Sequence, residues 1–214
     1  RGRMDSDNVD NPEGMNQTRL GGRFDTSKYL RPHSDIVALM VLEHQADMHN
    51  YITRANFLTR QALHHQESLN RELHEPADRV WDSTKSRIKN AGETLVEYLL
   101  FCGEAELTAP INGTSGFAEE FSQRGPRDPL GRSLRELDLT TRLFKYPCSY
   151  LIYSPSFAAL PREVKEYVLH RLHEIIAGQD QSEKFRHLSA ADRLAIGEIL
   201  QATLPDWAGT ASGG

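Results

Sequence analysis

The sequence lacks several features that mark common classes of protein. Its 214 residues contain no block of Lys or Arg, and the formal net charge is −5. Because the phosphate backbone of nucleic acids attracts concentrated positive charge, this composition makes nucleic-acid binding a poor expectation. No apolar stretch approaches the roughly 20 residues that a membrane-spanning helix needs, and no secretory signal peptide is visible. We therefore expect neither a nucleic-acid partner nor a membrane span.

Cysteine is scarce as well, since the sequence contains two, Cys102 and Cys148. Neither lies in a CxxC or CxxCH motif, which excludes covalently attached haem and a Cys-rich zinc site within these residues. A disulfide between the two is an open alternative if the protein is exported. Because the sequence starts with Arg1 rather than Met, we expect a processed form or a segment of a longer protein.

Helical periodicity dominates the rest of the chain. From Ser34 or Asp35, either of which suits an N-cap, the chain runs without Gly or Pro up to Pro76. The apolar residues in the first half lie on nearly every side, which predicts a long, mostly buried helix. A heptad-like apolar stripe after Pro76 predicts a second long helix that ends at Gly103. A short break separates the two, so we expect an antiparallel pair.

Composition divides the chain into three parts. Residues 1–33 are polar and predict an extended arm, and residues 205–214 predict a disordered tail. Residues 34–204 form a helical domain, interrupted at 103–137 by a loop rich in Pro and Gly. Shorter helices are expected at four places, starting near Ser133, Ser154, Pro161 and Ser189. No alternating strand pattern is visible, so the predicted fold class is all-α.

The stretch VLEHQADMHN at residues 41–50 is the first candidate site. Glu43 and Asp47 are four residues apart, so they form a polar stripe along an otherwise apolar helix. A buried carboxylate needs a cation or hydrogen bonds, so the stripe predicts either a metal site or a structural polar network. His44 and His49 point roughly 140° apart around the helix axis, so one ion does not take both.

Other residue spacings in the sequence are weaker indications of a metal site. Ferritin-like di-iron bundles need Glu-x-x-His, and this spacing is absent from the sequence. Glu166, His170 and His173 have a spacing that suits zinc, but they lie opposite the apolar face of their helix. A solvated polar face is the favoured interpretation for these three.

The loop at 103–137 carries a second candidate site. Four arginines recur along it, namely Arg124, Arg127, Arg132 and Arg135. Such a cluster suits an anion, a haem propionate or an acidic partner. The favoured alternative is internal pairing with Glu119, Glu120, Asp128 and Glu136. Shortly after the loop, four aromatics surround Cys148, which predicts core filling first and an aromatic pocket or partner surface second.

Three segments carry a resemblance to a known group of proteins: RPHSDIVALMVLEHQ, NGTSGFAEEFSQRGPRDPLGRSLRELDL and TRLFKYPCSYLIYSPSFAALP. Over roughly residues 24–204 the chain resembles the C-terminal helical region of large exported bacterial proteins associated with c-type cytochromes. The resemblance implies a periplasmic or exported domain and CxxCH haem sites in a preceding part of the protein. It also implies that this segment supplies a lid, a docking surface or a distal axial ligand such as His44 or His49.

The leading functional hypothesis is therefore an exported helical domain of a redox protein or complex. It would contact other chains or the preceding part of its own protein, including a c-type cytochrome. The candidate cofactor-binding residues are His44, His49, Arg124 and Arg127, and the cofactor would be haem or a divalent metal completed by partner residues. One alternative is a cofactor-free interaction module. The other is a helical-bundle metal enzyme that uses Glu43 and Asp47.

Overall fold

The computed structural model describes residues 22, 25–29 and 33–207. Helices dominate this part, and Leu137 and Phe144 pair in an isolated antiparallel bridge. The all-α prediction is confirmed. The described elements are α1 (Ile36–Glu72), α2 (Asp82–Leu99), α3 (Phe117–Ser122), η2 (Tyr150–Tyr153), α4 (Pro155–Ala158), α5 (Arg162–Ile176), η3 (Glu183–Phe185) and α6 (Ala190–Thr203).

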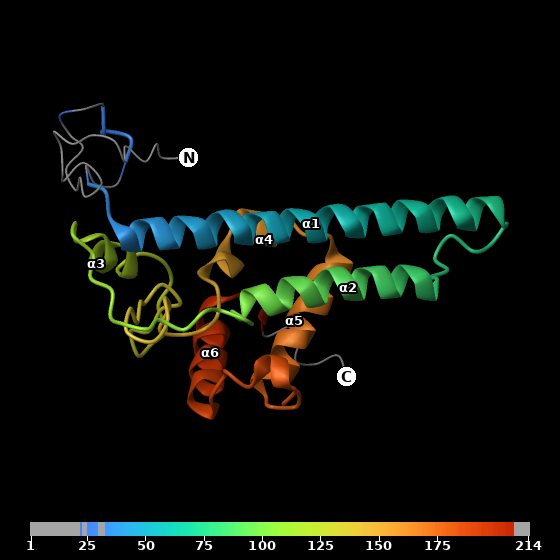
Figure 1. Cartoon of the computed structure of the whole chain (residues 1–214). Helices are drawn as coiled ribbons and strands as arrows, with labels where there is room; N and C mark the ends of the chain where they lie inside the picture. Colours follow the sequence, from blue (N-terminus) through green and yellow to red (C-terminus); the bar gives the residue numbers. More distant parts are fainter. Residues whose placement is uncertain (1–21, 23–24, 30–32, 208–214) are drawn as a thin grey trace.

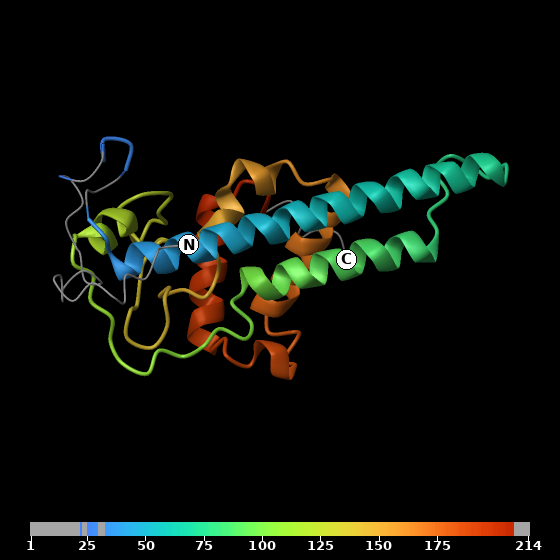
Figure 2. The same ribbon diagram turned by 45° about the horizontal axis from the view of Figure 1, so that its top comes forward.

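The helices α1 and α2 form the long axis of the molecule (Figure 1). Asp35 is the N-cap of α1, because its side chain accepts a hydrogen bond from the backbone N–H of Val37 at 2.8 Å. After a short connection α2 returns alongside α1, and the pair extends beyond α5 and α6 (Figure 2). The second helix ends at Leu99 rather than at the predicted Gly103, because Phe101 has a left-handed φ of 57°.

One core is shared by the inner side of α1, by α2, α5 and α6, and by the segment 134–160. Within it α5 packs against α2, and α6 packs against α5. The face of α5 that was predicted to be apolar is buried, and it consists of Val164, Val168, Leu172 and Ile175. Close approach of α5 to α2 depends on Gly92, because a Cβ there would collide with the ring of Tyr167. The last helix begins at the predicted cap, where Ser189 and Asp192 satisfy each other's backbone amides.

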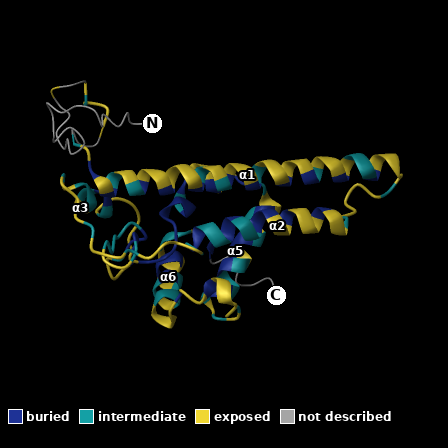
Figure 3. Ribbon diagram, in the orientation of Figure 1, coloured by how far each residue is buried: buried dark blue, intermediate teal, exposed yellow. Residues whose placement is uncertain are grey.

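One side of α1 is exposed along its whole length (Figure 3). Val41, Met48 and Ile52 face the core, while Leu39 is 49% and Leu42 is 59% exposed. The prediction of a mostly buried first half is therefore wrong. Other helices pack against α1 from one side, so the apolar residues on its opposite side remain at the surface.

The segment at 103–137 is largely irregular and contains α3. The helix that was predicted to restart at Ser133 does not form, although the backbone N–H of Ser133 donates to Oε1 of Glu136 at 3.1 Å as that motif requires. The chain then leaves helical geometry, since Leu137 enters the isolated bridge and Leu139 has a φ of 61°. The local capping contact therefore forms, but the chain continues into a turn instead of a helix.

The C-terminal end of the described chain belongs to the fold. Trp207 is 3% exposed, and its ring stacks on His173 with 3.7 Å between the ring centroids. The beginning of the tail predicted at 205–214 is therefore ordered. Residues 208–214 and most of the arm predicted at 1–33 lie outside the described residues.

Cys102 and Cys148 are both free thiols, so the open disulfide alternative is not formed. Burial raises the pKa of each thiol to about 12. Neither is a thiolate nucleophile at neutral pH, because the thiolate is the reactive form.

Candidate ligand-binding groove

A groove of about 550 Å³ opens between α1, α3 and the segment that runs from η2 into α4. Sites for small molecules have volumes of roughly 300 to 1,000 Å³. The side chains that give the groove its character are Leu42, His49, Phe117, Phe121, Arg124, Arg135, Tyr150 and Tyr153. The described lining contains no Asp or Glu. The groove therefore combines aromatic walls with positive charge.

Arg135 differs from its neighbours because its guanidinium lies against two aromatic rings. Its Cζ is 4.7 Å from the ring centroid of Phe121 and 4.3 Å from that of Tyr150. Gly125, which has a φ of 87°, leaves room for this side chain, since a Cβ there would lie 3.0 Å from Cδ of Arg135. Burial lowers the pKa of Arg135, and the positive charge of Arg124 lowers it further. The two rings meet edge to face with 5.2 Å between their centroids, so they contact the guanidinium from the same side and leave its N–H groups available for hydrogen bonds.

No acceptor for that edge lies within the described part of the chain. The guanidinium of Arg135 forms neither a hydrogen bond nor an ion pair there, and no carboxylate influences its pKa. The neighbouring arginines differ, because Arg124 pairs with Glu120 at 2.8 Å and Arg132 pairs with Asp128 at 2.6 Å. Internal pairing, the favoured alternative for this cluster, thus accounts for these two arginines but not for Arg135.

Arg127, a predicted cofactor residue, holds its own loop together. Its guanidinium donates to the carbonyl oxygen of Gly131 at 2.5 Å and to that of Ser122. Glu136 lies 3.5 Å from the same guanidinium. These contacts use the donors that a cofactor would need.

Two of the four predicted cofactor residues, His49 and Arg124, line the groove. His44 is instead 7% exposed, with its ring stacked on Phe101 at 4.7 Å between centroids. Its Nε2 lies 2.8 Å from Oγ of Ser149, which occupies the nitrogen that a haem iron would need. Burial lowers the pKa of His44 to about 4, so the ring is neutral at pH 7.

Glu43 and Asp47 are both exposed, so the expected burial of the carboxylate stripe is wrong. Asp47 contacts Tyr98, whose pKa is raised to about 12 by burial and by the charge of Asp47. Within the described ranges, no group of three or more His, Cys, Asp or Glu side chains lies close enough to hold a metal ion. The metal site at Glu43 and Asp47 stays a prediction.

The spacing of Glu166, His170 and His173 brings no common site together. His170 pairs with Glu174 at 3.2 Å, while Nε2 of His173 lies 2.9 Å from the carbonyl oxygen of Trp207. The two rings therefore serve separate contacts.

The wall formed by α3 is fixed to α1 through one carboxylate. Oδ2 of Asp35 accepts the backbone N–H of Thr114 at 2.9 Å, and the N–H and hydroxyl of Ser115 at 3.0 and 2.7 Å. Burial alone would raise the pKa of Asp35, but these hydrogen bonds outweigh it and the pKa lies below its usual value. Since α3 begins just after Ser115, Asp35 positions Phe117 and Phe121 along the groove.

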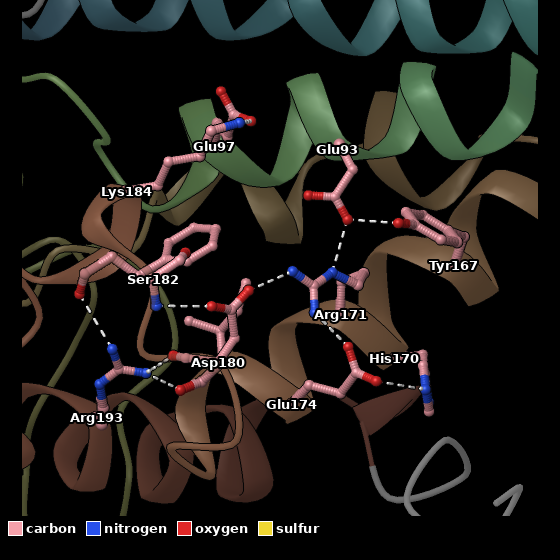
Figure 4. A network of polar contacts seen from close by, with 12 residues as sticks. Glu93, Glu97, Tyr167, His170, Arg171, Glu174, Asp180, Ser182, Lys184 and Arg193 are labelled. Atoms are coloured by element: carbon pink, nitrogen blue, oxygen red, sulfur yellow. Dashed lines mark hydrogen bonds and ion pairs between the residues drawn. The ribbon is translucent and has the colours of Figure 1, made fainter. Parts of the chain in front are cut away.

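A second polar cluster surrounds Arg171 where α2 meets α5 (Figure 4). Its Nε donates to Oε1 of Glu93 at 2.6 Å, its Nη2 donates to Oδ2 of Asp180 at 2.7 Å, and its Nη1 donates to Glu174. Tyr167 donates to the same Glu93 oxygen. The Arg171 hydrogen bond lowers the pKa of Asp180 to about 2. This cluster joins helices and has its donors satisfied internally.

No protein-family model, curated protein or solved structure matches the chain. Among the described helices, none is long and apolar enough to cross a membrane.

Proposed function

We propose that this chain is a binding domain whose groove between α1, α3 and η2 receives an anionic group of a ligand or partner. The observation that carries the proposal is Arg135, a partly buried guanidinium in an acid-free groove with no acceptor among the described residues. A charged group that is withdrawn from water is costly unless a counter-charge or hydrogen bonds compensate it. A bound anion would supply both.

The surroundings of Arg135 support a site that exists before the ligand arrives. Phe121 and Tyr150 both lie against the guanidinium, with ring centroids 4.7 and 4.3 Å from its Cζ. Asp35 ties α3 to α1 through three hydrogen bonds to Thr114 and Ser115. A guanidinium that is already oriented loses little side-chain entropy when it binds, and charge-assisted hydrogen bonds are about twice as strong as neutral ones.

The exported redox setting is also kept as a proposal, and it rests on the resemblance described above. In that setting the groove would be a docking site within a complex. Visible absorption spectra of the chain purified with its natural partners test this directly. A Soret band in the retained complex supports the setting, and its absence from every preparation counts against it.

Anion titration followed by ¹H–¹⁵N NMR tests the binding function. Chloride, sulfate, acetate and benzoate would be added at constant ionic strength, because exposed charges respond to salt. We expect at least one anion to shift amides in 117–125 and 149–155, and Arg135→Met to abolish these shifts. Arg54→Met is the matched control, since Arg54 is an exposed arginine of α1 that does not line the groove. Shifts that survive Arg135→Met, or no shifts with any anion, would contradict the proposal.

A further inference from the structure

We infer that the group received by the groove is a single carboxylate attached to an apolar body. This inference rests on the proposed binding function and adds the chemical class of the ligand. It follows from three properties of the groove: the geometry of its free donor, its net charge and the composition of its walls.

The geometry favours a planar, two-oxygen acceptor. Phe121 and Tyr150 lie against the same side of the Arg135 guanidinium, since their ring centroids are 5.2 Å apart. A ligand therefore reaches the guanidinium from its open side, and the N–H donors that it meets lie in one plane. Two parallel N–H donors match the two oxygens of a carboxylate. A halide or an alcohol would use one donor and leave the other without a partner.

The charge of the groove favours a monoanion. Arg124 is already neutralised by Glu120 at 2.8 Å. Arg135 therefore supplies the one uncompensated arginine charge of the described groove lining. A phosphate monoester carries close to two negative charges at neutral pH, so it would bring a charge that this groove does not balance.

The walls favour an apolar body. Phe117 and Phe121 stack with 5.5 Å between their centroids, and Leu42 contributes an aliphatic side chain that is 59% exposed. Tyr150 is buried and also lines the groove. Burial of apolar ligand surface contributes about 25 cal/mol per Å² and adds to the ion pair at Arg135. Acetate carries the negative charge but lacks a large apolar part, so we expect it to bind weakly.

Two sources offer this chemistry: a small organic acid, or the C-terminal carboxylate of a peptide chain that ends in an apolar residue. Calorimetric titration at pH 8 would compare 3-phenylpropionate, 3-phenylpropanamide, phenyl phosphate and acetate. A short peptide with a free C-terminal Phe and its C-terminal amide form the second arm. Tighter binding of the free-acid peptide assigns the site to a chain end, and tighter binding of 3-phenylpropionate assigns it to a small acid.

We expect the amides to bind about tenfold more weakly or worse, because a hydrogen bond to a charged group contributes about 1.5–3 kcal/mol. Arg135→Lys, which keeps the charge but loses the paired donors, should weaken the carboxylate ligands by a similar factor. Leu42→Glu should also weaken them, since it places an internal carboxylate in the groove lining. Leu39→Glu adds the same charge at an exposed position of α1 outside the lining and should leave affinity nearly unchanged.

The outcomes separate the inference from the function on which it rests. If phenyl phosphate binds at the groove and 3-phenylpropionate does not, the carboxylate assignment is overturned while anion binding stands. Equal affinity for acids and amides also overturns it, because the charge would then play no part. If no probe binds and no anion shifts the groove amides, both proposals fail.

Discussion

Arg135 and Arg171 occupy opposite situations in the same chain. The guanidinium of Arg171 donates to three carboxylates, those of Glu93, Glu174 and Asp180 (Figure 4). The guanidinium of Arg135 has no carboxylate partner in the described part of the chain and is held by cation–π contacts with two rings. An arginine whose charge is balanced by carboxylates inside the fold has no uncompensated charge for a ligand. An arginine that is oriented by stacking keeps its donors, and this difference distinguishes a structural junction from a binding site.

The largest loss of stability is expected when Arg171, the cation between α2 and α5, is removed. Arg171→Met leaves three carboxylates close together without a counter-charge, and the Arg171 side chain is 18% exposed, so solvent compensates little. Removal of one partner from a buried ion pair typically costs about 3–5 kcal/mol. We expect the free energy of unfolding, measured by urea titration, to fall by about that amount.

Arg162→Met on the same helix is the control for this prediction. The Arg162 side chain is 83% exposed and pairs with a single carboxylate, that of Glu166. Its urea midpoint should match that of the unmodified protein, because exposed pairs contribute little. Equal losses in the two variants would show that the Arg171 cluster does not stabilise the junction.

The next largest effect is a pH-dependent loss of stability that is caused by His44, which is buried in the core beside the groove. The pKa of His44 is about 4 in the folded protein against 6.5 for a free histidine. Between these values the unfolded state binds more protons, so stability is fully present above pH 6.5 and is lost as pH falls toward 4. The difference corresponds to roughly 3 kcal/mol.

His44→Gln keeps a hydrogen-bonding side chain near Ser149 and removes the titration. We expect its free energy of unfolding to fall less steeply than that of the unmodified protein over this pH range. Chemical denaturation at a series of pH values gives the two curves. Parallel curves would mean that His44 is not held neutral by the core.

A smaller loss of stability is expected when a methyl group is added between α2 and α5 without a change of charge. A Cβ at Gly92 would collide with the ring of Tyr167, whose hydroxyl donates to Glu93. Overpacking of this kind costs about 1–3 kcal/mol, which exceeds the gain of about 1 kcal/mol in helix propensity. Thermal unfolding of Gly92→Ala should therefore show a lower midpoint.

Gly197→Ala provides the comparison for Gly92→Ala. Gly197 also lies in a helix, and the nearest neighbour of an added Cβ is the γ2 methyl group of Ile176 at 3.1 Å. This contact needs a shift of only a few tenths of an ångström, whereas a Cβ at Gly92 would overlap the ring of Tyr167. A midpoint for Gly197→Ala as low as that of Gly92→Ala would remove the special role of the Tyr167 contact.

Local signals in the sequence predicted the helices well. Asp35 and Ser189 mark the starts of α1 and α6, because a capping side chain satisfies backbone amides within three residues of itself. The same locality explains an error. Ser133 and Glu136 make their short-range contact, yet Leu139 with its left-handed φ shows that the chain turns instead of continuing as a helix.

The candidate site depends on contacts that spacing along the chain does not encode. Sequence spacing grouped four arginines, but it did not indicate which one would lack an acceptor. Arg132 reaches Glu198, which is 66 residues away, and Asp35 binds Ser115, which is 80 residues away. Such partners become visible when α1, α6 and the irregular loop are placed together. The exposure of Glu43 has the same origin, because it depends on which side of α1 the other helices cover.

The smallest expected change in stability comes from Arg135→Met. It is the same kind of substitution as Arg171→Met, made in the groove instead of between α2 and α5. The variant loses stacking on Phe121 and Tyr150, worth about 0.5–1 kcal/mol at a partly exposed site. It also removes an uncompensated charge from a partly buried position, which offsets part of that loss. We expect the free energy of unfolding to change by less than about 1 kcal/mol while anion binding disappears. If Arg135→Met costs as much stability as Arg171→Met, Arg135 supports the fold and the groove loses the observation on which its binding role rests.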